Sequence, residues 1–232
     1  MNGNPRLIIL LTLSAVLASY IMINSEIASA QAKTSGFLGD YSQLEPSTDK
    51  SREGAMVYIK PGLDLKPYKA VHIAYPLVQL NSDERQSTVD PRDLTELASY
   101  FHDKMVAALE DNYSIVDEPG PGVLVVRTAI VDVKPINSVV GAIGKLALKV
   151  VNLEIGSASI EAELVDGDTG ERLAALVETK KGDRVGAGMS GAKQWGHAKA
   201  AFKSWAEVLA ERLDEFQLTK VPSGETADRK QN

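Results

Sequence analysis

The 232-residue chain contains no cysteine. This absence excludes disulfide bonds, thiolate catalysis, thiolate metal sites and the attachment of a lipid through a cysteine thioether. Basic residues are also in the minority, because 25 Lys and Arg stand against 31 Asp and Glu and give a formal net charge of −6. Nucleic-acid-binding domains usually carry a net positive charge that neutralises phosphates, so nucleic acid is not an expected partner.

Motifs for catalysis and for cofactor or metal binding are equally scarce. The histidines His72, His102 and His197 have neither H-x-x-x-H nor H-E-x-x-H spacing. Residues 186–191 match G-x-G-x-x-G, but a polar segment precedes them and no strand follows the next predicted helix, as a dinucleotide-binding fold requires. Ser190 lies one residue short of a nucleophile elbow, and His197 follows too closely to serve as its base. We therefore expect no cofactor, no metal ion and no enzymatic activity.

Acidic residues are spread evenly along the chain and form no evident catalytic pair. Asp166 and Asp168 are spaced like the first two ligands of a calcium-binding loop. However, Gly170 occupies the third ligand position and Val177 stands where the closing glutamate belongs. Turn formation is the simpler explanation of these two aspartates.

The N-terminus carries the most specific pattern in the sequence. Arg6 precedes an apolar run over residues 7–23, and small residues then recur at Ala30 and Ala32, as a signal peptidase requires. The pattern predicts a signal peptide over residues 1–30, with cleavage after Ala30 or Ala32, and therefore an exported protein in the periplasm or outside the cell. A retained membrane anchor is the alternative, although a helix of about 17 residues barely crosses a hydrocarbon core of about 30 Å.

About 200 residues remain after the signal peptide, which suits a single domain. Residues 31–52 are polar and predict an extended lead-in, pinned to the domain by apolar side chains such as Leu38 and Tyr41. We expect the domain over residues 53–218 and a flexible tail over residues 219–232.

Within the domain, the hydrophobic pattern alternates between the period of strands and that of helices. Asp90 and Pro91 predict the start of a helix, whose apolar stripe continues to Leu109. A second helix is predicted over about residues 194–216, and the turn residues 166–170 predict a hairpin. The expected strands span residues 56–59, 69–78, 113–116, 122–133, 157–165 and 173–179. The sequence therefore predicts an α+β fold, a mostly antiparallel sheet with two helices packed on one face.

An amphipathic segment at residues 139–152 is the candidate interaction site. If it forms a helix, apolar side chains gather on one side and lysines on the other. Its candidate residues are Val139, Ile143, Leu146 and Val150 on the apolar side and Lys145 and Lys149 opposite. Packing against the core is the simpler interpretation. The functional one is an exposed face that contacts another envelope protein or an anionic membrane surface.

Several stretches together resemble a known family. They are SGFLGDYSQL at residues 35–44, VYIKPGLDLKPYKAVHI, ELVDGDTGERLAAL, and the last helix with Trp195, Phe202 and Trp205. Over about residues 35–216 the chain is similar to a bacterial family catalogued as domain of unknown function 3313. The resemblance implies a small envelope protein, often described as a lipoprotein, with no established activity and no assigned catalytic residues. The lipoprotein cysteine is missing here, which favours a free periplasmic or secreted form.

Three functions remain open. The favoured one is a non-enzymatic module that binds an envelope protein or the membrane surface, for which an exposed apolar patch would be typical. The second is a carrier of a small or lipidic ligand in an apolar pocket. The least favoured is a hydrolase, which would need convergent carboxylates with raised pKa values. The sequence does not fix the oligomeric state.

Overall fold

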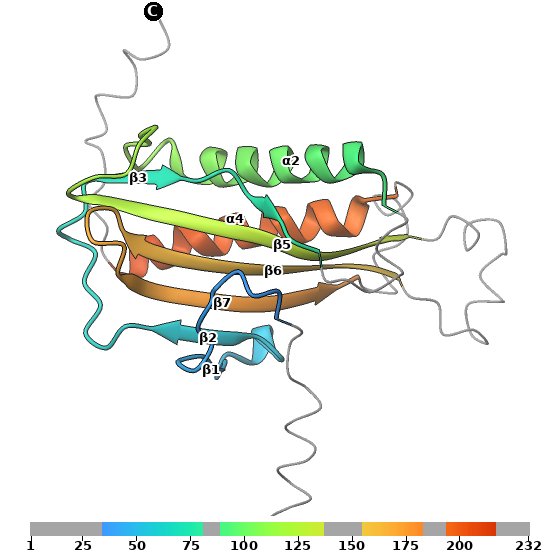
Figure 1. The fold of residues 1–232 in the computed structure, drawn as a ribbon, viewed down its shortest axis with the longest axis horizontal. Coiled ribbons are helices and arrows are strands. Elements are labelled where there is room, and N and C mark those ends of the chain that lie inside the picture. The colour runs from blue at the N-terminus through green and yellow to red at the C-terminus, as the bar shows by residue number, and fades with distance from the viewer. Residues whose placement is uncertain (1–33, 81–88, 137–154, 183–193, 217–232) are drawn as a thin grey trace, which may run out of the picture. The chain divides into compact units, whose positions relative to one another are not determined.

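The computed structural model describes residues 34–80, 89–136, 155–182 and 194–216 (Figure 1). All of them belong to the second of two compact units, Met1–Lys33 and Thr34–Asn232. Among the described residues, no helix has the length and apolar character needed to cross a bilayer.

The described elements form one sheet and two long helices. In chain order they are β1 (Glu45–Pro46), the 3₁₀-helix η1 (Lys50–Arg52), β2 (Met56–Ile59), β3 (Ala70–Ile73), β4 (Leu77–Val78), α2 (Pro91–Leu109), β5 (Val123–Ile136), β6 (Ile155–Asp166), β7 (Arg172–Lys181) and α4 (Gly196–Glu215). The strand order is β1-β2-β7-β6-β5-β3, and β4 also pairs with β5. β3 and β4 run parallel to β5, whereas the other pairs are antiparallel. The predicted α+β class with a mostly antiparallel sheet is confirmed.

The first helix begins as its sequence predicts. The side chain of Asp90 accepts a hydrogen bond from the backbone N–H of Arg92, and Pro91 takes the first helical position, where a missing N–H does no harm. The buried stripe runs to Leu109, and Phe101 stacks on Phe202 of α4 with ring centroids 4.8 Å apart. The two helices therefore share one core.

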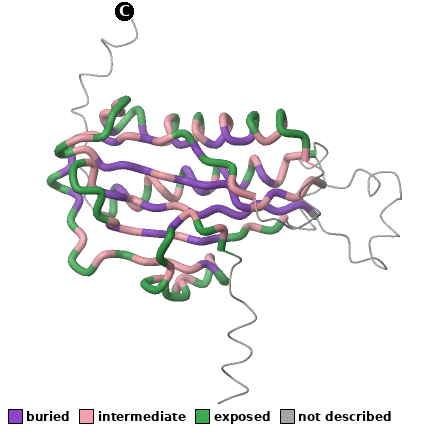
Figure 2. Tube along the Cα trace, viewed as in Figure 1, coloured by how far each residue is buried: buried purple, intermediate pink, exposed green. Residues whose placement is uncertain are grey.

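Side chains of the central strands alternate between two faces of the sheet. On β6, Ile160 joins the core cluster beneath the helices, whereas its neighbour Glu161 points to the opposite side. We call these sides the helix face and the outer face. α2 packs mainly against α4, and on the sheet it contacts β3 and β4. α4 contacts β5 and β6, behind which it is drawn in Figure 1. Figure 2 shows the buried stretches along these central strands.

Two of the predicted strands differ in the structure. Residues 69–78 form two short strands, β3 and β4, because the chain leaves β5 around Pro76, which has no N–H to donate. Residues 113–116 form only an isolated bridge, between Ile115 and Val71. The predicted strand at 122–133 extends to Ile136 as β5.

The hairpin between β6 and β7 is confirmed, and its turn explains Asp166. One carboxylate oxygen accepts hydrogen bonds from the backbone N–H groups of Asp168 and Thr169, and the other accepts one from the Tyr68 hydroxyl. Gly170 has φ of 72°, a conformation that favours glycine. Because the protein's own donors occupy this carboxylate, the structure supports the turn rather than a calcium loop.

Of the predicted lead-in at residues 31–52, only residues 34–44 are called the lead-in from here on. They cross the outer face in front of β6 and β7 (Figure 1). Glu161, which is 0% exposed, accepts hydrogen bonds from Ser35 N at 2.5 Å, Leu38 N at 3.3 Å and the Tyr41 hydroxyl at 2.6 Å. Arg172 on β7 donates to the carbonyl oxygen of Leu38. The prediction that apolar side chains pin the lead-in is confirmed at Leu38, which is buried.

Candidate functional site

An apolar groove opens on the helix face, beside α4 and over β7 and β2. A helix about 10 Å wide covers roughly two strands spaced about 4.8 Å apart, so two helices do not span this sheet. The hollow left beside α4 has a volume of about 140 Å³ and is partly open to solvent. Apolar side chains that define it include Val57, Ile59, Leu176, Val208, Leu209 and Phe216.

Short side chains create the hollow in the floor of the groove. Across paired strands, Ala162 of β6 faces Leu176 of β7, and Leu164 of β6 faces Ala174 of β7. Each leucine therefore lies beside an alanine, and the missing side-chain volume of Ala162 and Ala174 is not filled by either helix. At the rim, Ile59 is 46% exposed although it is a large apolar residue.

One polar side chain in the groove lacks a partner. Thr128 of β5 lines the hollow and is 4% exposed, and its hydroxyl oxygen makes no hydrogen bond in the described structure. A buried hydroxyl without a partner destabilises a protein by about 1–3 kcal/mol. Ordered water or a bound ligand can supply the partner of such a group.

Two arginines, Arg52 and Arg212, lie at the edge of the groove. Arg52 of η1 donates to buried Glu178 at 2.5 Å, and the indole N–H of Trp205 donates to the same carboxylate at 2.9 Å. Arg212 of α4 pairs with Glu215 at 2.5 Å and approaches Asp49 at 3.9 Å. The groove thus combines an apolar floor with a charged rim, as protein-binding sites commonly do.

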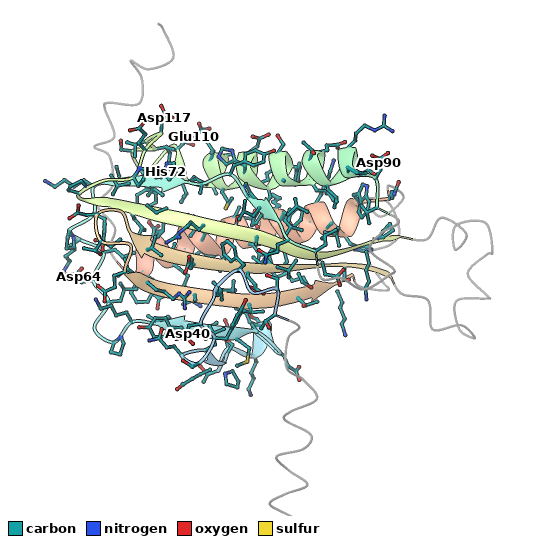
Figure 3. All side chains as sticks on the ribbon, in the orientation of Figure 1. Asp40, Asp64, His72, Asp90, Glu110 and Asp117 are labelled. Atoms are coloured by element: carbon teal, nitrogen blue, oxygen red, sulfur yellow. The ribbon has the colours of Figure 1, made fainter. Side chains whose placement is uncertain are left out.

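General acid catalysis needs a carboxyl group with a raised pKa, whereas the acidic side chains Asp40, Asp49, Asp90, Glu96 and Asp166 have lowered pKa values. Backbone hydrogen bonds from Thr169 and the Tyr68 hydroxyl lower the pKa of Asp166 to about 2. The Lys199 side chain lowers the pKa of Glu96 by a hydrogen bond and by its charge. Figure 3 shows Asp90 and Glu110 at opposite ends of α2, and Asp40 and Asp64 away from this helix.

Lys180 and Ser204 form the pair that most resembles a catalytic dyad. The ammonium of Lys180 lies 2.6 Å from the Ser204 hydroxyl, and burial lowers the pKa of Lys180. However, Ser204 lies inside α4, where the nearby backbone N–H groups are engaged in the helix and do not form an oxyanion site. Neither residue lines the groove. The pair is better explained as a hydrogen bond that links β7 to α4.

Comparison with known families identifies one match. The family described as protein of unknown function (DUF3313) matches residues 33–209. The chain belongs to this DUF3313 family. No curated protein matches it.

Solved structures with a similar fold are distant from this DUF3313 chain. A PelC dodecamer from Paraburkholderia phytofirmans has a TM-score of 0.37 at 11% identity, covering 65% of this chain and 96% of that one. A minor lipoprotein from Acinetobacter baumannii has a TM-score of 0.26 at 10% identity, covering 67% and 97%. With TM-scores this low, neither structure carries an argument about function.

The interaction site predicted for this DUF3313 chain, residues 139–152, lies outside the described residues. Its candidates Val139, Ile143, Leu146, Val150, Lys145 and Lys149 therefore remain a prediction, as do the signal peptide and the domain limits. Ser190 and the glycines at 186–191 also lie outside the described residues. The histidines occupy three elements, β3, α2 and α4, and no group of three or more potential metal ligands occurs in the described structure.

The sequence did not predict the groove, because the groove depends on which part of the sheet the two helices leave uncovered. Val57 and Ile59 belong to a correctly predicted strand, but nothing in their spacing tells which neighbour covers them. The available signal was the short side chains of Ala162 on β6 and Ala174 on β7. Without knowing that β6 and β7 bring them together, this signal has no meaning.

Proposed function

We propose that this protein is an exported, non-enzymatic binding module of the cell envelope that holds an apolar side chain of a partner protein in the groove beside α4. The observation that carries the proposal is the partly open apolar hollow of about 140 Å³. The signal-peptide pattern at residues 1–30 supports export.

The volume of the groove favours a protein partner over a carried lipid. An apolar cavity of about 150 Å³ holds one benzene molecule, whereas sites for drug-sized ligands have volumes of about 300–1,000 Å³. A hollow of about 140 Å³ therefore accepts one ring or one branched side chain but not a whole lipid. Protein interfaces are commonly anchored by single large side chains that enter such pockets.

The shape of the groove also favours a protein partner over a membrane surface. Surface-binding elements present a continuous apolar face flanked by basic residues to the lipid. Here the apolar residues line a recess, and its arginines Arg52 and Arg212 already have carboxylate partners in the protein. A projecting side chain reaches such a recess more readily than a flat bilayer does.

Binding of small probes tests the groove directly. Toluene and p-cresol, which reproduce the side chains of phenylalanine and tyrosine, are titrated into the mature protein and followed by methyl NMR. We expect saturable shifts at Ile59, Leu176 and Val208. Ala174→Leu should fill the hollow and abolish the shifts, while Ala200→Leu, at an exposed position on α4, should leave them unchanged.

Cross-linking then identifies the type of ligand. A photoreactive amino acid at Ile59 is activated in the native envelope, and we expect a protein adduct that Ala174→Leu removes. An adduct with lipid would instead support the carrier function. Absence of probe binding to a folded protein would contradict the proposal.

A further inference from the structure

The edge of the sheet beside the groove leaves one backbone position unpaired. Ile59 of β2 lines the groove, and the neighbouring strand β1 begins at Glu45, opposite Val57. Figure 1 shows β1 and β2 at this edge of the sheet. The chain before β1 turns away, because the N–H of Leu44 donates to the carbonyl oxygen of Tyr41 at 3.1 Å. No described strand therefore lies beside Ile59 on this side.

The backbone groups of Ile59 point toward that empty position. Along the middle strand of three antiparallel strands, successive residues bond alternately to one neighbour and to the other. The N–H of Lys60 donates to the carbonyl oxygen of Leu173 on β7 at 2.8 Å, so the N–H and C=O of Ile59 face away from β7. The carbonyl oxygen of Ala55, which shares this orientation, accepts from Ser47 N on the β1 side at 2.9 Å. In the described structure neither backbone group of Ile59 has a hydrogen-bond partner.

A free strand position selects an extended polypeptide as its partner. The backbone groups of a helix are satisfied within the helix, and the acyl chain of a lipid has no N–H or C=O group to offer. Addition of a strand to a sheet edge supplies main-chain hydrogen bonds, while a pocket beside the edge selects a side chain. Both features occur together here, since Ile59 also forms the rim of the apolar groove.

The neighbouring elements determine how far such a segment can pair. β1 already occupies the edge beside Val57, so an added strand exchanges one pair of hydrogen bonds with Ile59 and must then turn. The outer face next to β1 is taken by residues 41–44, the end of the lead-in. The groove opens on the helix face instead. A segment that turns onto the helix face therefore brings its next side chains to the mouth of the groove.

We infer that the partner of the groove is an extended segment of a protein, which pairs its backbone with Ile59 as an added edge strand and places a following apolar side chain in the groove. The inference rests on the function proposed above. It assigns recognition to two hydrogen bonds with the Ile59 backbone and to one side chain in the hollow of about 140 Å³. Proline is excluded at the paired position of the partner, because it has no N–H to donate.

Hydrogen exchange of the mature protein gives the first test. In the free protein we expect the Ile59 N–H to exchange rapidly, while the N–H of Tyr58, which faces β7, is protected. The probes are three acetylated heptapeptides, Lys-Thr-Thr-X-Thr-Thr-Lys with Phe, Leu or Met at X, because threonine favours strands. At least one peptide should bind saturably and slow the exchange of Ile59. An Ile59 amide that is already protected in the free protein would contradict the inference.

Two substitutions at one position separate the backbone from the side chain. Ile59→Ala and Ile59→Pro both remove the isoleucine side chain, but only proline also removes the N–H. The loss of this N–H breaks no bond to β7, because it faces away from that strand. We expect Ile59→Pro to bind the peptide roughly five- to tenfold more weakly than Ile59→Ala, as for one lost hydrogen bond. Toluene should bind equally to the two variants, because it contacts the groove alone.

A peptide control covers the case in which Ile59→Pro does not fold. The heptapeptide with every backbone nitrogen methylated keeps its side chains but has no donors, and we expect it not to bind the wild-type protein. Binding as tight as that of the unmethylated peptide would overturn the inference.

The outcomes distinguish the strand addition from the proposed function. If toluene binds but no peptide does, or if the two Ile59 variants bind the peptide equally, the strand addition is wrong and the groove's binding function stands. If neither toluene nor a peptide binds to the folded protein, both are wrong.

Discussion

Glu161 is a carboxylate with no exposed surface, and the lead-in supplies its three donors, two backbone N–H groups and the Tyr41 hydroxyl. A buried charge is tolerated only when hydrogen bonds replace the lost water. The same contacts raise the pKa of Tyr41, through burial first and then through the hydrogen bond to Glu161. The side chain therefore serves as the attachment point of residues 34–44 on the sheet.

Replacing this carboxylate tests the attachment. Glu161→Gln puts an amide N–H₂ where a donor now points, so we expect a loss of about 1–3 kcal/mol in the free energy of unfolding. Tyr41→Phe removes the hydrogen bond to Glu161 and those that the hydroxyl accepts from Gly36 N and Leu38 N, and it should reduce the free energy of unfolding by about 1–3 kcal/mol. Urea denaturation measures both, with Tyr58→Phe on the same face as the control. Equal stability of Glu161→Gln and the wild type would show that the lead-in does not depend on this residue.

Asp166 predicts a pH dependence of stability. Its pKa in the folded protein is about 2, lowered first by the backbone N–H of Thr169 and then by the Tyr68 hydroxyl, from an ordinary value of 3.8. A lowered folded-state pKa adds stability above pH 4 that is lost as the pH falls towards 2. We expect Asp166→Asn to be less stable at pH 7 and to show a flatter decline between pH 4 and 2. An unchanged acid profile would contradict the assignment.

The α2–α4 contact illustrates what periodicity reveals about an element. The stripe through Leu97, Phe101 and Met105 was predicted from spacing, and it is buried. We expect Phe101→Ala, which breaks the stacking on Phe202 at 4.8 Å, to destabilise the fold by about 3–5 kcal/mol. Thermal and urea unfolding measure this loss, and Asp103→Ala, at an exposed position on α2, should change little. A loss as small as that of Asp103→Ala would mean that the helices do not share a tight core.

Elements whose partners lie far away in the sequence were harder to predict. β2 was predicted with its limits, yet it pairs with β7, more than a hundred residues later, because a strand pattern specifies its faces but not its neighbour. For the same reason the parallel pairing of β3 with β5 was not foreseen. Burial of Glu161 was also unexpected, since its donors come from a lead-in that looks merely polar. The groove belongs to this class, because it exists only after sheet and helices are assembled.

For the whole molecule, the lead-in should be part of the folded domain rather than a linker. Cleavage after Ala30 or Ala32 would keep Ser35, Leu38 and Tyr41, the residues that bind Glu161. We expect a chain lacking residues 1–33 to be as stable as the mature protein, because no contact of the lead-in is lost. A chain lacking residues 1–44 should lose several kcal/mol, since each of the lost hydrogen bonds contributes about 0.5–1.5 kcal/mol and the buried Glu161 is left without donors.

Urea denaturation of the two truncated chains, with hydrogen exchange on β6 and β7, measures the difference. Faster exchange confined to these strands in the shorter chain would locate the loss on the outer face. The double change, removal of residues 1–44 together with Glu161→Leu, should recover part of the stability, because it removes the unsatisfied buried charge. If the shorter chain is as stable as the longer one, the lead-in contributes nothing to the fold, and its contacts with Glu161 and Arg172 would have to be explained in another way.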